Sequence, residues 1–319
     1  MATATSPTVT ALVALMKIKG VGRRGALRIV EGITADPDPR RFQQMVMASA
    51  GRTRLAEDDL ADAWLRSETQ LRESEEAGIQ AFALFDTGYP ARLKLIPDPP
   101  AVLYVKGSPV GLAGKGSLAV VGTREPTDYG ARVARKSASS AVEAGFVIVS
   151  GLAHGCDTLG HEGCLDAEGV GVAVLAHGLD KVYPAANKGL AARLLETGGC
   201  LVSEYPIGMT PMRTAFAERD RIQSGLSDGV LVIETDIKGG TMHTVRFARE
   251  QRRALACIDH PERLRGEEKA QGNRQLIADR WATPVPDGDA LTRFLESLRR
   301  PNPTEFSPPA SGQQTTMAF

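Results

Sequence analysis

Short runs of consecutive apolar residues, separated by amphipathic stretches, dominate the chain from about residue 80 onward. Because these runs are continuously apolar rather than alternating, they are typical of strands that are covered on both faces of a sheet. Strands are expected at 101–105, 117–121, 146–149, 171–175, 200–202, 229–233 and 254–258. Helices are expected between them at 129–144, 157–167, 188–197 and 241–251. This repeated strand–helix order predicts an α/β fold with a doubly wound sheet of parallel strands.

The residues before about position 80 follow a helical pattern instead. A mostly apolar stretch, 9–18, is broken by a glycine-containing turn, and helical periodicity resumes over 23–31. A longer helix is expected over 57–77, which is dense in Glu, Arg, Leu and Ala and is followed by Gly78. The Asp-Pro-Asp-Pro segment at 36–39 is expected to form a loop between them.

These changes of pattern predict three parts of the chain. Residues 1–78 are expected to form a helical domain and residues 79–285 an α/β domain. Residues 286–319 are expected to be a C-terminal segment whose end, rich in Pro, Ser, Gln and Thr, is disordered.

The charge and cysteine content limits the classes of function. The 319 residues carry 38 Lys and Arg against 38 Asp and Glu, a formal net charge of zero. This balance excludes a strongly cationic nucleic-acid binder, so any such contact has to come from a local patch. The four cysteines form no CxxC pair and no disulfide framework, which favours a reducing compartment. With neither an apolar run of about 18 residues nor a secretory signal visible, we expect a cytoplasmic protein with no membrane contact.

Glycine-containing turns follow three of the expected strands, at the edge where a doubly wound sheet binds ligands. They are Gly122-Thr123-Arg124, the segment 150–157 and the segment 234–241. Each leads into a helix, whose free N–H groups favour an anion, and Arg124 and Lys238 add positive charge. None matches GxGxxG or GxxxxGK[ST], so neither an NAD site nor ordinary ATP hydrolysis is expected. Three such turns together predict one anion-binding site, although each alone is also consistent with strand-to-helix packing.

The segment from Phe216 to Arg221 places an aromatic ring beside two arginines. A ring stacks on a nucleobase and guanidinium groups bind phosphates, which is the combination that a single-stranded nucleic-acid site requires. The alternative is a solvated run of charges in which Glu218 and Asp220 pair with the arginines.

One helix face carries residues that are capable of binding a metal ion. Asp157, His161 and Cys164 are spaced at i, i+4 and i+7. Because no second cluster completes a coordination shell, we expect a packed face on which Asp157 caps the helix or pairs with His161. The sequence indicates no metal site, no cofactor and no catalytic residue, so an enzyme is not expected.

Several ordered motifs between residues 89 and 280 resemble the DNA-processing protein A (DprA/Smf) family. They include Tyr89-Pro-Ala-Arg-Leu, PDPPAVLYVKG at 97–107, Val120 to Arg124, Ser150-Gly-Leu-Ala-x-Gly-x-Asp157 with His161, Ser203-Glu-Tyr-Pro206, Phe216 to Arg221 and Lys238-Gly-Gly-Thr241. The N-terminal turn that contains Gly20 and Gly22 resembles the helix-hairpin-helix or sterile-alpha-motif-like module common in that family. A tight helical connection with no DNA contact is an equally good interpretation of this turn.

The resemblance implies an extended Rossmann-like domain that binds single-stranded DNA, forms a homodimer and loads the recombinase RecA during DNA uptake or processing. Taken with the strand-end turns, it implies that the DNA or phosphate is bound by Arg124, Ser150, Gly151, Gly155, Phe216, Arg219, Arg221, Lys238, Gly240 and Thr241. It implies that the pocket is supported by Gly122, Thr123, Asp157, His161 and Glu234. No metal or cofactor is implied.

The chain also departs from the family pattern. Members typically have Asn in place of Asp220 and often a small residue in place of Glu218, and the usual serine of the Lys-Ser-Gly-Ser turn is Gly239 here. The residues after 280 are too few for the winged-helix domain of many members. These departures favour, as an alternative, a paralogue that acts as an antitoxin or regulatory sensor in a phage-defence or toxin–antitoxin system, with a toxin as partner. A minor alternative is a nucleotide phosphoribohydrolase-like enzyme with Glu234 against the ribose.

Overall fold

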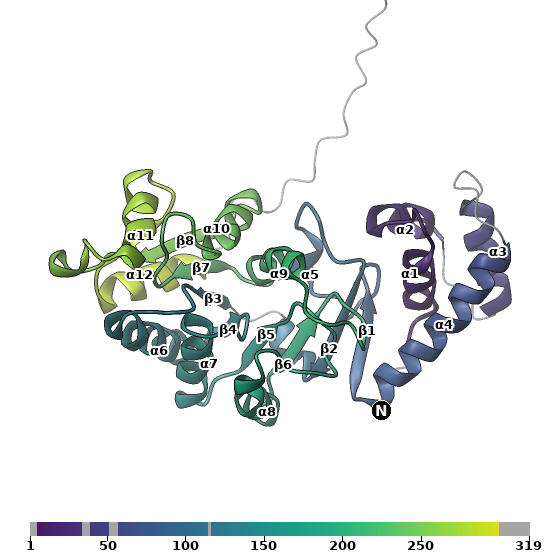
Figure 1. The fold of residues 1–319 in the computed structure, drawn as a ribbon, viewed down its shortest axis with the longest axis horizontal. Coiled ribbons are helices and arrows are strands. Elements are labelled where there is room, and N and C mark those ends of the chain that lie inside the picture. Colours follow the sequence, from purple (N-terminus) through teal and green to yellow (C-terminus); the bar gives the residue numbers. More distant parts are fainter. Residues whose placement is uncertain (1–4, 34–38, 51–56, 114–115, 300–319) are drawn as a thin grey trace, which may run out of the picture.

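A nine-stranded mixed sheet forms the centre of the computed structural model, which describes residues 5–33, 39–50, 57–113 and 116–299 (Figure 1). The strand order across the sheet is β1-β2-β6-β5-β4-β3-β7-β8-β9. The strands are β1 (Ile79–Ala83), β2 (Val102–Gly107), β3 (Ser117–Val121), β4 (Val147–Ser150), β5 (Gly171–Val174), β6 (Cys200–Ser203), β7 (Gly229–Val232), β8 (Ala254–Ile258) and β9 (Thr283–Val285).

The strand directions place a topological switch in the middle of the sheet. In the parallel part of the sheet, the first strand along the chain is β3, and β4, β5 and β6 follow in order on one side of it. The chain then returns, and β7, β8 and β9 lie on the other side of β3. All pairings from β6 to β9 are parallel. In open α/β sheets the ligand crevice lies where the strand order reverses, here between β3 and β7, at the carboxyl ends of the strands.

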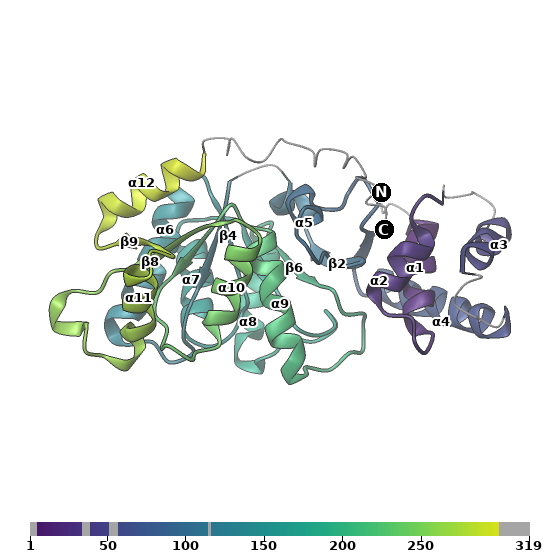
Figure 2. The same cartoon turned by 90° about the horizontal axis from the view of Figure 1, so that it is seen from above.

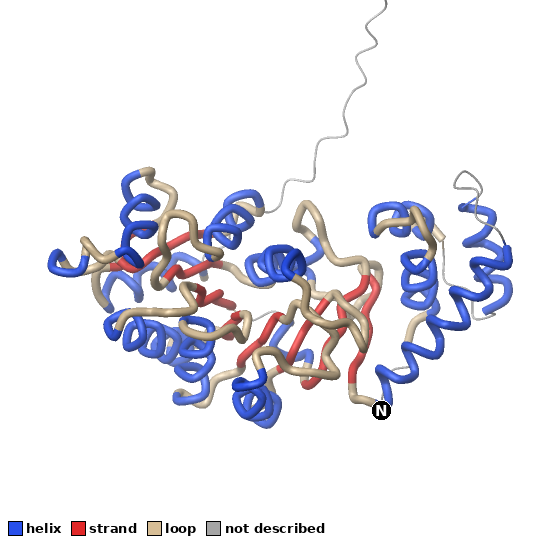
Figure 3. Tube along the Cα trace, viewed as in Figure 1, coloured by secondary structure: helices blue, strands red, loops and turns tan. Residues whose placement is uncertain are grey.

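Helices cover both faces of the sheet, which appears as one layer of strands in Figure 3. In the α/β region they are α5 (Ala91–Lys94), α6 (Asp128–Glu143), α7 (Cys156–Asp166), α8 (Lys188–Glu196), α9 (Arg213–Gly225), α10 (Thr241–Glu250), α11 (Glu268–Ala278) and α12 (Gly288–Leu298). Short 3₁₀ segments lie at Pro109–Leu112, Ala185–Asn187 and Glu262–Leu264.

Alternation along β3 shows how one strand serves both faces. Leu118 and Val120 belong to a hydrophobic cluster with α6, α7 and α12. Ala119 and Val121 belong to a different cluster, with α10 and α11. Successive side chains of a strand point to opposite faces, so a strand that is buried on both sides must be apolar at every position.

The helices α1 (Pro7–Lys17), α2 (Arg23–Val30), α3 (Pro39–Ala50) and α4 (Glu57–Glu76) lie at the β1 edge of the sheet, at one end of the molecule (Figures 1 and 2). They share a hydrophobic cluster with the sheet, in which Leu12 and Leu15 of α1 are buried together with Val102 and Tyr104 of β2. The glycine-containing turn after α1 has Gly20 in the left-handed region, at φ +88°, and Gly22 precedes α2.

The predicted doubly wound α/β fold is confirmed, with two differences. The first is that β2, expected as a parallel strand, pairs antiparallel with both β1 and β6. A parallel pairing needs a long crossover connection, usually a helix. In the described chain, only the 3₁₀ segment Pro109–Leu112 lies between β2 and β3. The second is that two strands, β1 and β9, and five helices, α3, α5, α9, α11 and α12, were not expected. Most of the loop expected at 36–39, and the tail from residue 300, lie outside the described residues.

Among the described residues, no helix has the length and apolar character needed to cross a bilayer.

Candidate nucleic-acid interface

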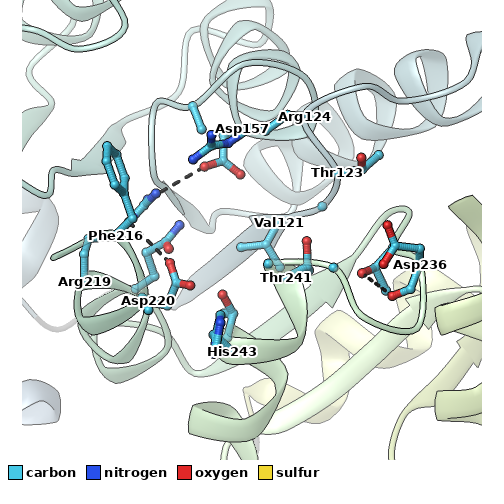
Figure 4. Close-up of a pocket in the computed structure, with 18 of the residues that line it drawn as sticks. Val121, Thr123, Arg124, Asp157, Phe216, Arg219, Asp220, Asp236, Thr241 and His243 are labelled. Atoms are coloured by element: carbon cyan, nitrogen blue, oxygen red, sulfur yellow. Dashed lines mark hydrogen bonds and ion pairs between the residues drawn. The ribbon is translucent and has the colours of Figure 1, made fainter. Parts of the chain in front are cut away.

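A pocket of about 460 Å³ lies at the switch point of the sheet (Figure 4). Its walls come from the loops that follow β3, β4 and β7, from one face of α9 and from the start of α10. The three turns that the sequence singled out therefore meet in one place. Of the expected residues, those that line the pocket are Gly122, Thr123, Arg124, Asp157, Phe216, Arg219, Gly240 and Thr241.

Backbone hydrogen bonds connect the loop after β3 to the loops after β4 and β7. The Thr123 N–H donates to the carbonyl of Glu234 at 2.7 Å, and the Cys156 N–H donates to the carbonyl of Thr123 at 3.1 Å. Gly155 has φ +74°, and a Cβ there would lie 2.5 Å from the carbonyl of Arg124. Only glycine fits this backbone conformation and this close approach without strain.

The Arg124 guanidinium and the Phe216 ring form the mouth of the pocket (Figure 4). The guanidinium carbon lies 5.6 Å from the ring centroid, within the range of a cation–π contact. Arg124 is exposed and Phe216 is half-buried. The ring of Tyr183, which is half exposed, lies 5.8 Å from that of Phe216, centroid to centroid. The pair Arg124–Phe216 thus presents a positive charge and an aromatic surface side by side.

Arg219 is buried deeper and is flanked by two carboxylates. Its Nη1 lies 3.7 Å from Oδ2 of Asp157 and donates to the carbonyl of Val174 at 3.2 Å. Its Nε lies 3.3 Å from Oδ1 of Asp220. Burial, with a smaller effect from the Asp157 charge, raises the pKa of Asp220 to about 7 against the opposing effect of Arg219. Burial also raises the pKa of Asp157. The floor of the pocket is therefore close to neutral, and its net charge depends on pH.

Like Gly155, the expected residues Lys238 and Gly151 lie at the pocket loops without lining the pocket. Lys238 is exposed on the loop after β7, where its N–H donates to Oδ1 of Asp236 at 2.9 Å. Gly151 is buried, and its N–H donates to Oδ2 of Asp157 at 3.1 Å. A side chain on Gly151 would overlap the Arg219 guanidinium, so this glycine makes room for the arginine.

Arg221 lies on a different side of α9 and is not brought to the pocket. It is 3% exposed, and its Nη2 donates to Oε2 of Glu204 at 2.5 Å. The same carboxylate accepts from Arg23 of α2 at 2.9 Å, and both arginines also pair with Asp98. Arg221 therefore connects α9 to the N-terminal helices, and Arg23 is engaged in the same cluster.

Ser150, His161 and Glu234 are buried and lie outside the pocket lining. The Ser150 hydroxyl donates to the carbonyl of Val120 at 2.7 Å. The Glu234 carboxylate accepts from the N–H and the hydroxyl of Thr127, at 2.8 and 2.6 Å, and lies 3.2 Å from Nε2 of His260. These bonds lower its pKa although burial acts in the opposite direction.

The expected packed face is confirmed, because Asp157, His161 and Cys164 are all buried. Asp157 does not pair with His161 but turns toward Gly151 and Arg219. Burial lowers the pKa of His161 to about 3, so its ring is neutral. Within the described ranges, no three His, Cys, Asp or Glu side chains are grouped as metal ligands.

The pocket residues that were not anticipated from the sequence include Arg213, Gln223, His243 and Lys269. Arg213 and Gln223 belong to α9, at −3 and +7 from Phe216, so recognition of this helix would have placed them on its pocket face. Lys269 belongs to α11, and no local pattern in the sequence connects it to this site.

Comparisons with known proteins agree with this architecture. The family model described as DNA recombination-mediator protein A matches residues 80–296. The chain is 37% identical over 244 residues to the Smf protein of Synechocystis, covering 72% of this chain and 61% of that protein. It is 42% identical over 173 residues to the Smf protein of Escherichia coli, covering 54% of this chain and 46% of that protein. The matched regions thus span about half to three-fifths of these relatives.

Two solved structures have a similar fold. DNA processing protein A from Streptococcus pneumoniae matches with a TM-score of 0.69 and 26% identity, over 90% of this chain and 95% of that one. DNA processing protein A from Helicobacter pylori matches with a TM-score of 0.60 and 27% identity, over 69% of this chain and 95% of that one.

Proposed function

Because the chain belongs to the DNA recombination-mediator protein A family, we propose that it binds single-stranded DNA in the pocket between β3, β7 and α9. The related protein from Helicobacter pylori was solved to describe its single-stranded DNA binding mode. We further propose that the protein acts on this DNA as a non-enzymatic recombination mediator, as a homodimer that loads a RecA-type recombinase.

The observation that carries the proposal is the Arg124–Phe216 pair at the mouth of the pocket. A base stacks on the ring while the guanidinium, 5.6 Å from its centroid, binds the adjoining phosphate. The start of α10 at Thr241 adds N–H groups that are not satisfied within the helix and a partial positive charge. Stacking and phosphate contacts depend little on sequence, so they supply binding to any single strand.

Local charge supports the same conclusion in a protein of zero net charge. Arg124, Arg213 and Lys238 are exposed around the pocket. Of the acidic groups that line the pocket, Asp157 and Asp220 are buried against Arg219, and Asp236 accepts from the backbone N–H of Lys238. Glu125 is exposed, against the three exposed cations. The exposed rim is therefore more basic than the composition of the chain suggests.

The test is binding of a labelled thymidine oligonucleotide across a range of salt concentrations. Arg124→Ala should weaken binding and reduce the slope of log K against log salt by about 0.7, the value of one lost phosphate contact on a single strand. Arg132→Ala, on the exposed surface of α6 outside the pocket, is the matched control and should change neither quantity. Absence of binding by the unmodified protein at low salt, or equal loss in the two variants, would refute this function.

The minor alternative, a phosphoribohydrolase with Glu234 against the ribose, gains no support from this geometry. Glu234 is 1% exposed and its carboxylate is occupied by Thr127 and His260. It therefore stabilises the start of α6 rather than facing the pocket.

A further inference from the structure

The floor of the pocket contains a buried amide whose nitrogen has no partner. Gln223 is 1% exposed and lines the pocket, and no described residue forms a hydrogen bond with its Nε2. A buried amide donor without a partner costs stability, so such groups call for an explanation in a native structure. Its position in the pocket indicates that a ligand supplies the missing acceptor.

Gln223 belongs to a row of residues on one face of α9. Phe216, Asp220 and Gln223 stand at i, i+4 and i+7, and all three line the pocket. A carboxylate and an amide therefore lie on the same helix face as the ring on which a base is proposed to stack. Figure 4 shows Phe216 and Asp220 on the same side of the pocket, with Arg219 between them.

We propose that Asp220 and Gln223 read the edge of a guanine base whose phosphate is held at the mouth of the pocket. This inference rests on the proposed function, because it uses the same pocket and the same stacking ring. Guanine presents a carbonyl acceptor followed by two N–H donors along its Watson–Crick edge. The carboxylate oxygens of Asp220 accept the two donors, and the Gln223 amide nitrogen donates to the carbonyl.

The other bases match this pair less well. Adenine places a ring-nitrogen lone pair where guanine has an N–H, so that the lone pair faces the carboxylate. Cytosine and thymine each offer one donor beside two acceptors. Discrimination then comes as much from the unfavourable contact with the wrong base as from the favourable contact with guanine. Oδ1 of Asp220 lies 3.3 Å from Nε of Arg219, and this ion pair holds the carboxylate in place.

The experiment compares thymidine oligonucleotides that carry a single central dG, dA, dC or no substitution, measured by fluorescence anisotropy at about pH 8, where the Asp220 carboxylate is mostly ionised. The unmodified protein should prefer the dG oligonucleotide by about tenfold, the size of one good base-edge contact. Gln223→Leu and Asp220→Asn should each abolish the preference. Gln275→Leu, at an exposed position of α11 outside the pocket, should retain it.

A folding control accompanies the binding data. Gln223→Leu removes an unpartnered buried amide, so its thermal unfolding midpoint should equal or exceed that of the unmodified protein. A loss of preference in a variant of unchanged stability then reports on recognition.

Competition with free GMP and AMP distinguishes recognition of guanine within single-stranded DNA from recognition of a free guanine nucleotide. Displacement of the dG oligonucleotide by GMP and not by AMP, together with a dG preference, supports guanine reading within DNA. Binding of GMP without binding of any oligonucleotide supports guanine reading but refutes the single-stranded DNA function. Equal affinity for all four oligonucleotides, or a dG preference that survives both substitutions, overturns the inference of guanine reading. The proposed function, binding of single-stranded DNA, still stands in either case if the oligonucleotides bind.

Discussion

The substitution Asp220→Asn is expected to tighten the binding of a thymidine oligonucleotide and to flatten its dependence on pH. Asp220 lines the pocket, its Oδ1 lies 3.3 Å from Nε of Arg219, and burial raises its pKa to about 7. Asparagine has nearly the same shape but no charge. The substitution therefore removes the pH-dependent negative charge at position 220 while the neighbouring packing is kept.

The magnitude follows from Coulomb's law. A phosphate about 6 Å from an ionised carboxylate is repelled by about 0.7 kcal/mol in water and by about 3 kcal/mol at an effective dielectric constant of about 20. These energies correspond to roughly 3-fold and 100-fold in affinity. With a pKa of about 7, the carboxylate is mostly protonated at about pH 6 and mostly ionised at about pH 8. Affinity of the unmodified protein should therefore fall as pH rises through about 7.

The assay is anisotropy of a labelled oligonucleotide at constant ionic strength from about pH 6 to about pH 8. At both limits of this pH range, the Asp220→Asn variant should bind the oligonucleotide about as tightly as the unmodified protein binds it at the acidic limit. His243 also lines the pocket, so the profile of His243→Gln is measured in parallel. An unchanged pH profile in Asp220→Asn, or weaker binding of thymidine oligonucleotides at the alkaline end, would refute the reasoning.

Three other predictions concern stacking, the loop backbone and the buried ion cluster. Phe216→Ala should lose about 1–3 kcal/mol of oligonucleotide binding in the anisotropy assay, while Phe216→Tyr retains it. Gly155→Ala should reduce the free energy of unfolding in urea by about 1–3 kcal/mol, because alanine is strained at φ +74°. Arg221→Ala should reduce the same free energy by about 3–5 kcal/mol, because it leaves the buried Glu204 carboxylate without one of its two arginines.

Each of these predictions has an outcome that contradicts it. Equal oligonucleotide affinity in Phe216→Ala would show that the ring packs but does not stack on a base. Gly189→Ala, at a helical position with open space around it, is the control for Gly155→Ala, and equal effects of the two would remove the argument from backbone strain. A stable Arg221→Ala variant with weakened DNA binding would place Arg221 at the interface after all.

The core strands and the edge at which the site lies were predictable because their signals are local. The predicted strands 117–121 and 254–258 coincide with β3 and β8. A strand that is covered on both faces must be apolar at every position, and that requirement is visible in a short window. The glycine turns after β3, β4 and β7 were identified for the same reason, since a sharp change from strand to helix constrains neighbouring residues.

The roles of individual charged residues depended on helix phase and on distant partners. Arg219 and Arg221 are two residues apart, so on a helix they point to nearly opposite sides, and the sequence pattern treated them alike. Arg221 donates to Glu204, and the same carboxylate accepts from Arg23, nearly 200 positions earlier than Arg221. Gln223 joins the pocket only because α9 lies across the switch point.

From its sequence alone, then, this protein is an α/β chain whose binding edge is marked by three glycine turns, since backbone requirements act over a few residues. The tertiary structure alone decided which side chains face that edge, which are engaged in buried ion pairs, and that Asp220 and Gln223 line the same pocket as Phe216. Those outcomes depend on burial and on charges brought together from separate elements, and the free energy of a charged group is set by these surroundings rather than by its neighbours in the chain.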